Sequence, residues 1–251
     1  MRILQGLIDV IGFLTAIPVR LNEHSLKNAA EHMYLFPLVG GFIGLVGGVI
    51  AYLIGQAFPR IVAATISLFA IFALTRFYHI DGLLDFGDGL VAHGSKMEKL
   101  RAMKDCRIGA GGLTLGLMII LLTIWTITSF PQELIVQYFM VSEVLAKFSM
   151  IVLAVFGRSA REGTNRYFVA AMKGQRGYVR FLLAVVISVT VSFPLVGLKA
   201  IYAAITTIFV SFFILAISNI NFGGITGDVF GATNEVSRIA SFLILLAVTS
   251  S

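Results

Sequence analysis

The chain has 251 residues, of which 58% are hydrophobic and only 13% are charged, and its mean hydropathy is +0.93. So few polar side chains cannot cover a water-soluble globule, which excludes that class and indicates one polytopic membrane domain over residues 1–251. The formal net charge of +6 would suit nucleic acid, but the cations gather in two loops between apolar segments, as they do at a membrane surface. We therefore expect a lipid bilayer as the partner and no nucleic acid.

The N-terminal segment is apolar from Ile3 to Ile17 and breaks at Pro18. It lacks the small-x-small cleavage site of a signal peptide, so we expect an amphipathic or re-entrant first helix. Spanning a bilayer takes about 20 apolar residues. Seven later segments approach this length: Tyr34–Ala57, Ile61–Tyr78, Gly111–Phe130, Leu134–Phe156, Val179–Gly197, Ala200–Ile220 and a shorter one near Ile239–Val248. The predicted fold is all-α, a transmembrane bundle of about seven spanning helices.

Two of the connecting loops are long and basic. One carries Lys96, Lys99, Arg101, Lys104 and Arg107, and the other carries Arg158, Arg161, Arg166, Lys173, Arg176 and Arg180. Because two spans separate these loops, both lie on one side of the membrane, and the positive-inside rule makes that side the cytoplasm. We expect a protein of the plasma membrane whose chemistry-capable segments all face the cytoplasm.

The run from His79 to Gly89 holds three carboxylates, Asp81, Asp85 and Asp88. Each residue advances a helix by about 100°, so spacings of four and three place all three within a fan of about 60°. Like charges this close repel one another, and a hard divalent cation such as Mg²⁺ offsets the repulsion and commonly holds a phosphate as well. The run therefore predicts a metal site for a phosphate ester. An ordinary polar turn is the alternative, because Asp and Gly also form turns.

Asp81 and Asp85 are the expected metal ligands, and Asp88 is either a further ligand or the base that accepts a proton from an attacking hydroxyl. We expect His79, which is adjacent, to be catalytic together with Asp85 and Asp88. The glycine-rich segment Gly223–Glu235 is centred on Asp228. Asp228 is expected to complete the metal cluster from another helix, with Asn234 and Glu235 about two turns further along.

The segment Met103–Gly112 begins with basic side chains and ends in glycines that open the next span. Exposed backbone N–H groups, a positive helix end and a guanidinium together suit a phosphate. The residues expected to bind the phosphates are Lys104, Asp105, Arg107 and Gly109, with Arg161 of the second basic loop beside them. Anchoring to lipid headgroups is the alternative for both loops.

Three further features have structural interpretations. Glu143 and Lys147 stand four residues apart inside a span, where charges are costly, so we interpret them as a neutralising pair. The small-xxx-small ladder of Gly40, Gly44 and Gly48 indicates close packing of two helices. The single cysteine, Cys106, excludes an internal disulfide and has no companions for a zinc site.

Taken together, these segments resemble the cobalamin synthase family, also called adenosylcobinamide-GDP ribazoletransferases. The resemblance is carried, in family order, by Phe13–Pro18, Phe36–Gly40, His79–Gly89, Met103–Gly109, Ala160–Gly163 and Thr226–Ala232. The sequence departs from the family at Cys106, where serine is frequent, and at Phe86, where small residues are frequent.

The resemblance implies a membrane enzyme that transfers phosphoryl-linked cobinamide from adenosylcobinamide-GDP to α-ribazole or its 5′-phosphate, with GMP leaving and Mg²⁺ required. On this basis we expect metal ligation by Asp81, Asp85 and Asp228, proton transfer to Asp88, and phosphate binding by Lys104, Arg107 and Arg161.

Two other functions stay open. A CDP-alcohol-type phosphotransferase also gathers aspartates and glycines on cytoplasmic helix ends, but its pattern has Ala-Arg soon after the first Asp-Gly, whereas Leu-Leu-Asp follows Asp81-Gly82 here. An ion-coupled transporter would use the carboxylates for cations, although it would more naturally distribute them toward the bilayer midplane. The oligomeric state also stays open, a homo-oligomer included.

Overall fold

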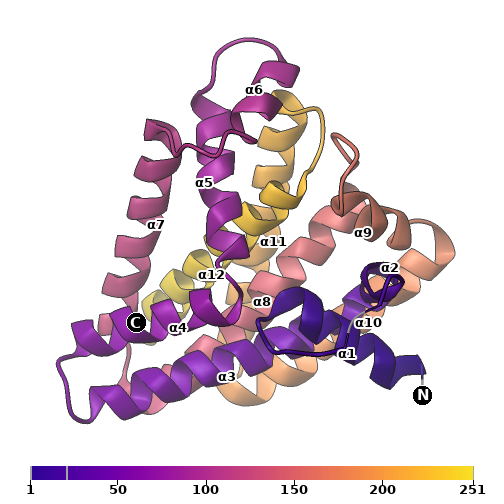
Figure 1. Cartoon of the computed structure of the whole chain (residues 1–251). Helices are drawn as coiled ribbons and strands as arrows, with labels where there is room; N and C mark the ends of the chain where they lie inside the picture. Colours follow the sequence, from indigo (N-terminus) through magenta and orange to yellow (C-terminus); the bar gives the residue numbers. More distant parts are fainter. Residues whose placement is uncertain (1, 21, 251) are drawn as a thin grey trace.

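The computed structural model describes residues 2–20 and 22–250, and these ranges contain helices and loops but no named strand. Within them, six helices are long and apolar enough to cross a membrane, and a bent pair makes seven if it counts as one span. The predicted all-α transmembrane bundle is confirmed (Figure 1).

The elements follow one another as short and long helices. In chain order they are α1 (Arg2–Leu14), α2 (Ser25–Glu31), the 3-10 turn η1 (Met33–Leu35), α3 (Phe36–Gly55), α4 (Arg60–Leu74), α5 (Tyr78–Val91), α6 (Lys96–Ala102), α7 (Ala110–Thr128), η2 (Gln132–Leu134), α8 (Ile135–Phe156), α9 (Asn165–Ala171), α10 (Gly174–Val196), α11 (Lys199–Asn221) and α12 (Gly227–Ser250). The six candidate spans contain α3, α7, α8, α10, α11 and α12.

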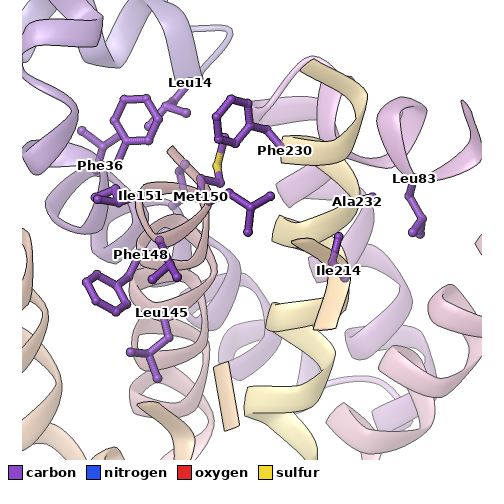
Figure 2. Packing of buried hydrophobic residues seen from close by; sticks show 14 of the residues in the cluster. Leu14, Phe36, Leu83, Leu145, Phe148, Met150, Ile151, Ile214, Phe230 and Ala232 are labelled. Atoms are coloured by element: carbon purple, nitrogen blue, oxygen red, sulfur yellow. The ribbon is translucent and has the colours of Figure 1, made fainter. Parts of the chain in front are cut away.

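Helices α8 and α12 form the centre of the bundle. The share of the span buried inside the protein is 89% for α8 and 72% for α12, but only 17% for α10. Leu145 of α8 and Phe230 of α12 belong to the buried core (Figure 2). Large apolar side chains such as Trp125, Leu182 and Phe209 are exposed on α7, α10 and α11, so these outer helices present a surface that suits lipid tails.

Helix α3 packs against α8 along the predicted glycine ladder. A Cβ at Gly48 would stand 2.8 Å from the Cα of Val136, and Cβ atoms at Gly40 and Gly44 would meet backbone carbonyl groups of α8. Such spacing leaves no room for side chains, so the glycines bring the two backbones into contact. The packing interpretation of the ladder is confirmed.

The last helix corrects the expectation of a short apolar segment near Ile239–Val248, because α12 is 24 residues long. Its mean hydropathy of 1.3 is the lowest of the six candidate spans. The reason is that its first half carries Asn234, Glu235 and Arg238, all buried against protein. A hydropathy pattern scores such residues as if they faced lipid, and it therefore misses the first half of the span.

The expected span Ile61–Tyr78 is also corrected. Helix α4 ends at Leu74, and α5 leaves it at an angle of 92°. Arg76 and Phe77 have φ values of 54° and 59°, a left-handed conformation that costs a non-glycine residue about 1–2 kcal/mol. This turn places the predicted carboxylates on a helix of their own, which lies between α7 and α12 (Figure 1).

The N-terminal helix α1 is apolar but, at 13 residues, too short to span. Its buried Asp9 accepts a hydrogen bond from Asn28 Nδ2 of α2 at 2.5 Å. Just beyond α1, the backbone N–H of Ala16 donates to the carbonyl of Leu74 at 2.6 Å. This bond ties the end of α1 to the sharp turn between α4 and α5.

Candidate active site

The two basic loops lie at the same end of the bundle, beside the end of α11 and the start of α12. From the first loop, Lys96 Nζ donates to the carbonyl of Asn219 at 3.1 Å, and Lys99 Nζ donates to Asn221 Oδ1 at 2.7 Å. From the second loop, Arg158 also reaches the chain just before α12. The prediction that both basic loops share one side is confirmed.

A short parallel bridge joins the second basic loop to the segment before α12. The N–H of Ala160 donates to the carbonyl of Ile225 at 2.9 Å, and the N–H of Ile225 donates to the carbonyl of Arg158 at 2.8 Å. The buried Asn165 donates from Nδ2 to the same Ile225 carbonyl at 2.8 Å. At Gly224, φ is +156° and a Cβ would meet the Arg158 carbonyl, so glycine is required. No sequence motif had pointed to this bridge.

Glycines also bring α5 and α12 into backbone contact. A Cβ at Gly82 would stand 2.8 Å from the carbonyl oxygen of Asp228, and a Cβ at Gly231 would stand 2.8 Å from that of His79. Helices approach so closely only where side chains are missing. Because Gly82 directly follows Asp81, this contact brings carboxylates from two helices, far apart in the sequence, to one place.

A cavity of about 590 Å³ opens among these elements, and we call it the rim cavity. Its walls include most of the predicted site residues, namely Asp81, Asp85, Lys104, Asp105, Arg107, Arg161 and Asp228. Over the described ranges, no three side chains of the His, Cys, Asp and Glu types stand close enough to form a ready metal site. The carboxylates thus line a cavity and do not converge on a point.

Arg161 and Asp228 form an ion pair across the rim cavity. Arg161 Nη2 donates to Asp228 Oδ2 at 3.1 Å, and the two side chains are 23% and 24% exposed. Thr226 Oγ1 donates to the same oxygen at 3.1 Å. These donors orient the carboxylate, and the guanidinium would find a second partner in any phosphate that entered the cavity.

Asp105 and Arg107 form a pair in the loop before α7. Arg107 Nε and Nη2 donate to the two oxygens of Asp105 at 3.1 and 2.9 Å. These side-chain hydrogen bonds, with one from the Arg107 backbone, lower the pKa of Asp105 to about 2. Because an exposed pair contributes little free energy, a phosphate can replace Asp105 beside Arg107. The two hydrogen bonds hold the Arg107 guanidinium beside Asp105, and the expected role of Asp105 in phosphate binding stays a prediction.

Asp88 does not line the rim cavity. Its Oδ2 accepts a hydrogen bond from the N–H of Gly109 at 2.7 Å, and its Oδ1 accepts one from the N–H of Gly112 at 2.8 Å. Asp88 therefore caps the N-terminus of α7, the position at which the sequence predicts a phosphate. The carboxylate of Asp88 thus binds backbone N–H groups that were expected to bind a phosphate. The ligand and base roles of Asp88 stay predictions, and both of its oxygens already have partners.

His79 lines a second cavity of about 390 Å³, which shares Asp81 and Asp228 with the rim cavity. His79 is 7% exposed. The two shared aspartates therefore stand where the two cavities adjoin. The sequence predicts His79 as a neighbour of the carboxylates, and the structure confirms this placement without testing its catalytic role.

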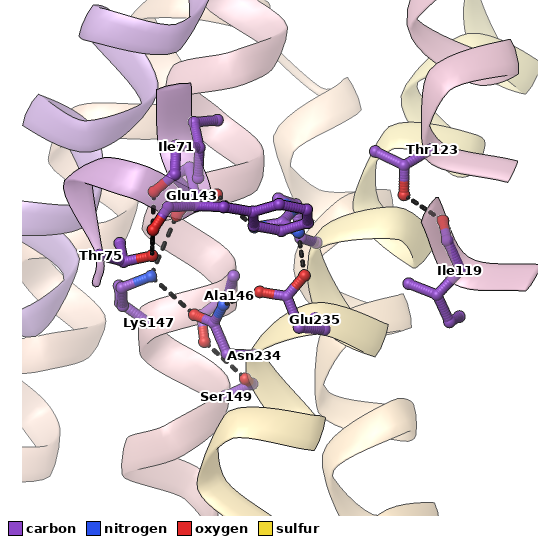
Figure 3. Close-up of polar contacts among 12 residues, drawn as sticks. Ile71, Thr75, Ile119, Thr123, Glu143, Ala146, Lys147, Ser149, Asn234 and Glu235 are labelled. Carbon is purple, nitrogen blue, oxygen red and sulfur yellow. Dashed lines mark hydrogen bonds and ion pairs between the residues drawn. The ribbon is translucent and has the colours of Figure 1, made fainter. Parts of the chain in front are cut away.

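The expected pair of Glu143 and Lys147 is confirmed at 3.0 Å, but it belongs to a larger cluster (Figure 3). Arg238 Nη1 donates to Glu143 Oε1 at 3.2 Å and Nη2 contacts Glu235, while Lys147 Nζ donates to Asn234 Oδ1 at 2.7 Å. Two carboxylates and two cations, each at most 1% exposed, balance in charge as burial requires. Asn234 and Glu235 thus belong to the centre of the bundle and not to the rim cavity.

The fold and the rim cavity define a polytopic membrane protein that sets carboxylates beside cationic side chains, a combination suited to a phosphate ester and its counter-ion. The family described as Cobalamin-5-phosphate synthase matches residues 6–246. The chain belongs to this family, and the resemblance of its motifs is confirmed.

The relatives match over nearly their full length. The adenosylcobinamide-GDP ribazoletransferase of Methanocella arvoryzae is 37% identical, with 98% of this chain and 97% of that protein covered. Proteins of the same name from Methanococcoides burtonii and Thermoanaerobacter pseudethanolicus are 32% and 27% identical. They cover 98% and 99% of this chain, and 94% and 100% of their own lengths. No solved structure matches the chain.

Proposed function

We propose that this protein is an adenosylcobinamide-GDP ribazoletransferase. It joins adenosylcobinamide-GDP to α-ribazole, or to α-ribazole 5′-phosphate, to give adenosylcobalamin or its 5′-phosphate and GMP in a late step of cobalamin biosynthesis. Family membership over nearly the whole chain supports the proposal. The observation that carries it is the rim cavity, where three carboxylates of α5 and α12 lie with three cationic side chains from two loops.

The chemistry follows from the bonds that change. A ribosyl hydroxyl forms a bond to the phosphorus that carries cobinamide, the pyrophosphate bond to GMP breaks, and the hydroxyl proton is released. Negative charge grows on the leaving oxygen, so positioning and charge neutralisation supply most of the rate. Lys104, Arg107 and Arg161 line the rim cavity, and their cationic groups would donate to these oxygens. Both oxygens of Asp88 bind backbone N–H groups, so the proton passes to water or to a carboxylate oxygen of the rim cavity that does not hold the ion.

We further propose that Asp81, Asp85 and Asp228 supply the ligands of Mg²⁺. Their hard oxygen donors suit this ion, which protein sites commonly bind through one or two carboxylates while water and substrate phosphates complete its shell. The carboxylates line a cavity of about 590 Å³, which has room for an ion that enters together with a pyrophosphate. When bound, Mg²⁺ would supply neutralisation of the phosphate oxygens. Arg161 would then move from Asp228 toward a phosphate.

We propose the cytoplasmic membrane as the location, with the rim cavity open to the cytoplasm. The two loops richest in Lys and Arg lie at the cavity end of the bundle, and basic loops stay on the cytoplasmic side. The pyrophosphate and GMP, both highly charged, would then enter and leave through water.

The test uses purified protein in sealed lipid vesicles with adenosylcobinamide-GDP, α-ribazole and Mg²⁺. Cobalamin and GMP should form in equal amounts, whereas a transporter would move substrate into the vesicles without releasing GMP. Asp85→Ala should abolish turnover and leave membrane insertion intact. The matched control is Glu162→Ala, which removes an exposed carboxylate that pairs with Arg166 at 2.6 Å and should keep activity. Failure of the wild type to form either product, beside an active relative, would refute the proposal.

A further inference from the structure

Four phenyl rings from four different helices line the second cavity, together with Tyr78 of α5, and we call it the aromatic cavity. They are Phe13 of α1, Phe36 of α3, Phe168 of α9 and Phe230 of α12. The ring centroid of Phe168 lies 4.6 Å from that of Phe13, 5.7 Å from that of Phe36 and 6.3 Å from that of Phe230. Phe36 and Phe230 lie near the upper end of α8 in Figure 2. Rings from α1, α3, α9 and α12 thus surround one space.

The aromatic cavity also holds an unpartnered polar side chain. His79 is 7% exposed, and among the described residues neither of its ring nitrogens takes part in a hydrogen bond. Neither nitrogen is among the fully buried side-chain atoms that lack a partner, and His79 lines the cavity, so the imidazole can hydrogen-bond to a molecule that occupies it. A ligand that entered the cavity with a hydroxyl or a ring nitrogen would supply the missing partner.

We propose that the aromatic cavity binds the acceptor, a nucleoside whose base is a flat, bicyclic and largely apolar aromatic, with its ribosyl group directed toward Asp81 and Asp228. The proposal rests on the proposed function, which supplies α-ribazole as such an acceptor. Offset and edge contacts with the four rings favour a flat base. His79 hydrogen-bonds to the nucleoside.

The size of the cavity selects the acceptor over the donor. A space of about 390 Å³ lies at the lower end of the range that small-molecule sites span, roughly 300–1,000 Å³. A corrin ring with its side chains and nucleotide is several times larger than a benzimidazole riboside. The guanine of the donor is also flat, and Thr164, Tyr78 and Asp228 of the cavity lining carry polar groups, so the experiment below measures binding of both α-ribazole and GDP.

The position of the cavity explains how the two substrates meet. Asp81 and Asp228 line both cavities, so a ribosyl hydroxyl that extends past them reaches the phosphates held in the rim cavity. The close approach of α5 and α12 at Gly82 and Gly231 thereby sets the distance between acceptor and donor.

The experiment measures equilibrium binding of α-ribazole to the protein in lipid nanodiscs, with binding of GDP and steady-state transfer kinetics measured on the same samples. Phe168→Leu keeps an apolar side chain but removes the central ring. It should weaken α-ribazole binding about fivefold to tenfold, since an aromatic pair is lost, and leave GDP binding within twofold. The matched control, Phe209→Leu, removes a ring that is 69% exposed on α11 and should change neither.

His79→Gln and His79→Phe separate hydrogen bonding from packing. The phenylalanine variant should raise the Kd and the KM for α-ribazole by tenfold or more, and the glutamine variant should restore part of the loss. If Phe168→Leu fails to fold, Phe230→Leu and the His79 variants decide the question. Weaker GDP binding with unchanged α-ribazole binding would overturn the inference and assign the cavity to guanine. A wild type that binds α-ribazole but forms no cobalamin would contradict the proposed function alone.

Discussion

Replacing Asp88 separates the capping of a helix from the binding of a metal ion. The carboxylate accepts hydrogen bonds from the N–H groups of Gly109 at 2.7 Å and Gly112 at 2.8 Å. Asp88→Ala removes the cap, which is worth about 0.5–2 kcal/mol, and a negative charge at the positive helix end, worth about 0.3–1 kcal/mol. We expect the free energy of unfolding to fall by about 1–3 kcal/mol. Asp88→Asn keeps one acceptor oxygen and should lose about half as much.

The uncapped helix should also affect the substrate, because the loop that precedes α7 carries Lys104 and Arg107. We expect Asp88→Ala to raise the KM for adenosylcobinamide-GDP several-fold while the Mg²⁺ concentration for half-maximal rate stays unchanged. The assay combines denaturant unfolding in detergent with steady-state kinetics and a Mg²⁺ titration. Asp85→Asn is the matched comparison, since Asp85 lines the rim cavity and should lose turnover while keeping stability.

One result would refute this reasoning. If Asp88→Ala unfolds like the wild type but needs much more Mg²⁺, the carboxylate serves the ion and not the helix. The capping contact would then be incidental to its function, and the ligand role expected from the helical spacing would be correct.

Two further substitutions test the contact of α5 with α12 beside the rim cavity and the ion cluster at the centre of the bundle. Gly82→Ala would place a Cβ 2.8 Å from the Asp228 carbonyl oxygen. Such overpacking costs about 1–3 kcal/mol, and we expect kcat to fall at least tenfold. In the control Gly41→Ala, the new Cβ meets only ordinary contacts at 3.4 Å, so the variant should retain activity. Arg238→Leu leaves Glu235 buried without its cationic partner, so the free energy of unfolding should fall by about 3–5 kcal/mol. A variant with both residues changed to leucine should recover part of this loss. No loss of stability in the single variant would contradict the pairing.

Much of the membrane architecture could be predicted from the sequence, because a bilayer imposes a length and a polarity on every spanning segment. Five apolar runs match candidate spans closely, and charge asymmetry placed both basic loops at one end. The glycine ladder of α3 predicted its contact with α8. These features depend on local composition, which a linear pattern records.

The features that were predicted wrongly, or were not predicted, depend on neighbouring helices and loops. The polar half of α12 spans because Arg238 and Glu235 pair with side chains of α8 and of their own helix, which a hydropathy pattern does not see. The sharp turn at Arg76 and Phe77 contains no glycine, so it carried no sequence signal for left-handed backbone. Asn165 fastens the second basic loop through one buried amide, and a single asparagine in a loop predicts nothing by itself.

The sequence by itself determined which residues could do chemistry, namely acidic residues in helical spacing and basic residues in two loops, and its glycine ladder indicated one close helix contact. Only the tertiary structure decided which of these residues line the rim cavity and which bind another helix. Asp81, Asp85 and Asp88 lie on one face of α5, yet α12 and α7 contact that helix at different heights, so Asp81 and Asp85 line the rim cavity with Asp228 while Asp88 caps α7. Helical periodicity sets the direction of a side chain from its own axis, whereas the partner that it meets depends on which other helices pack there.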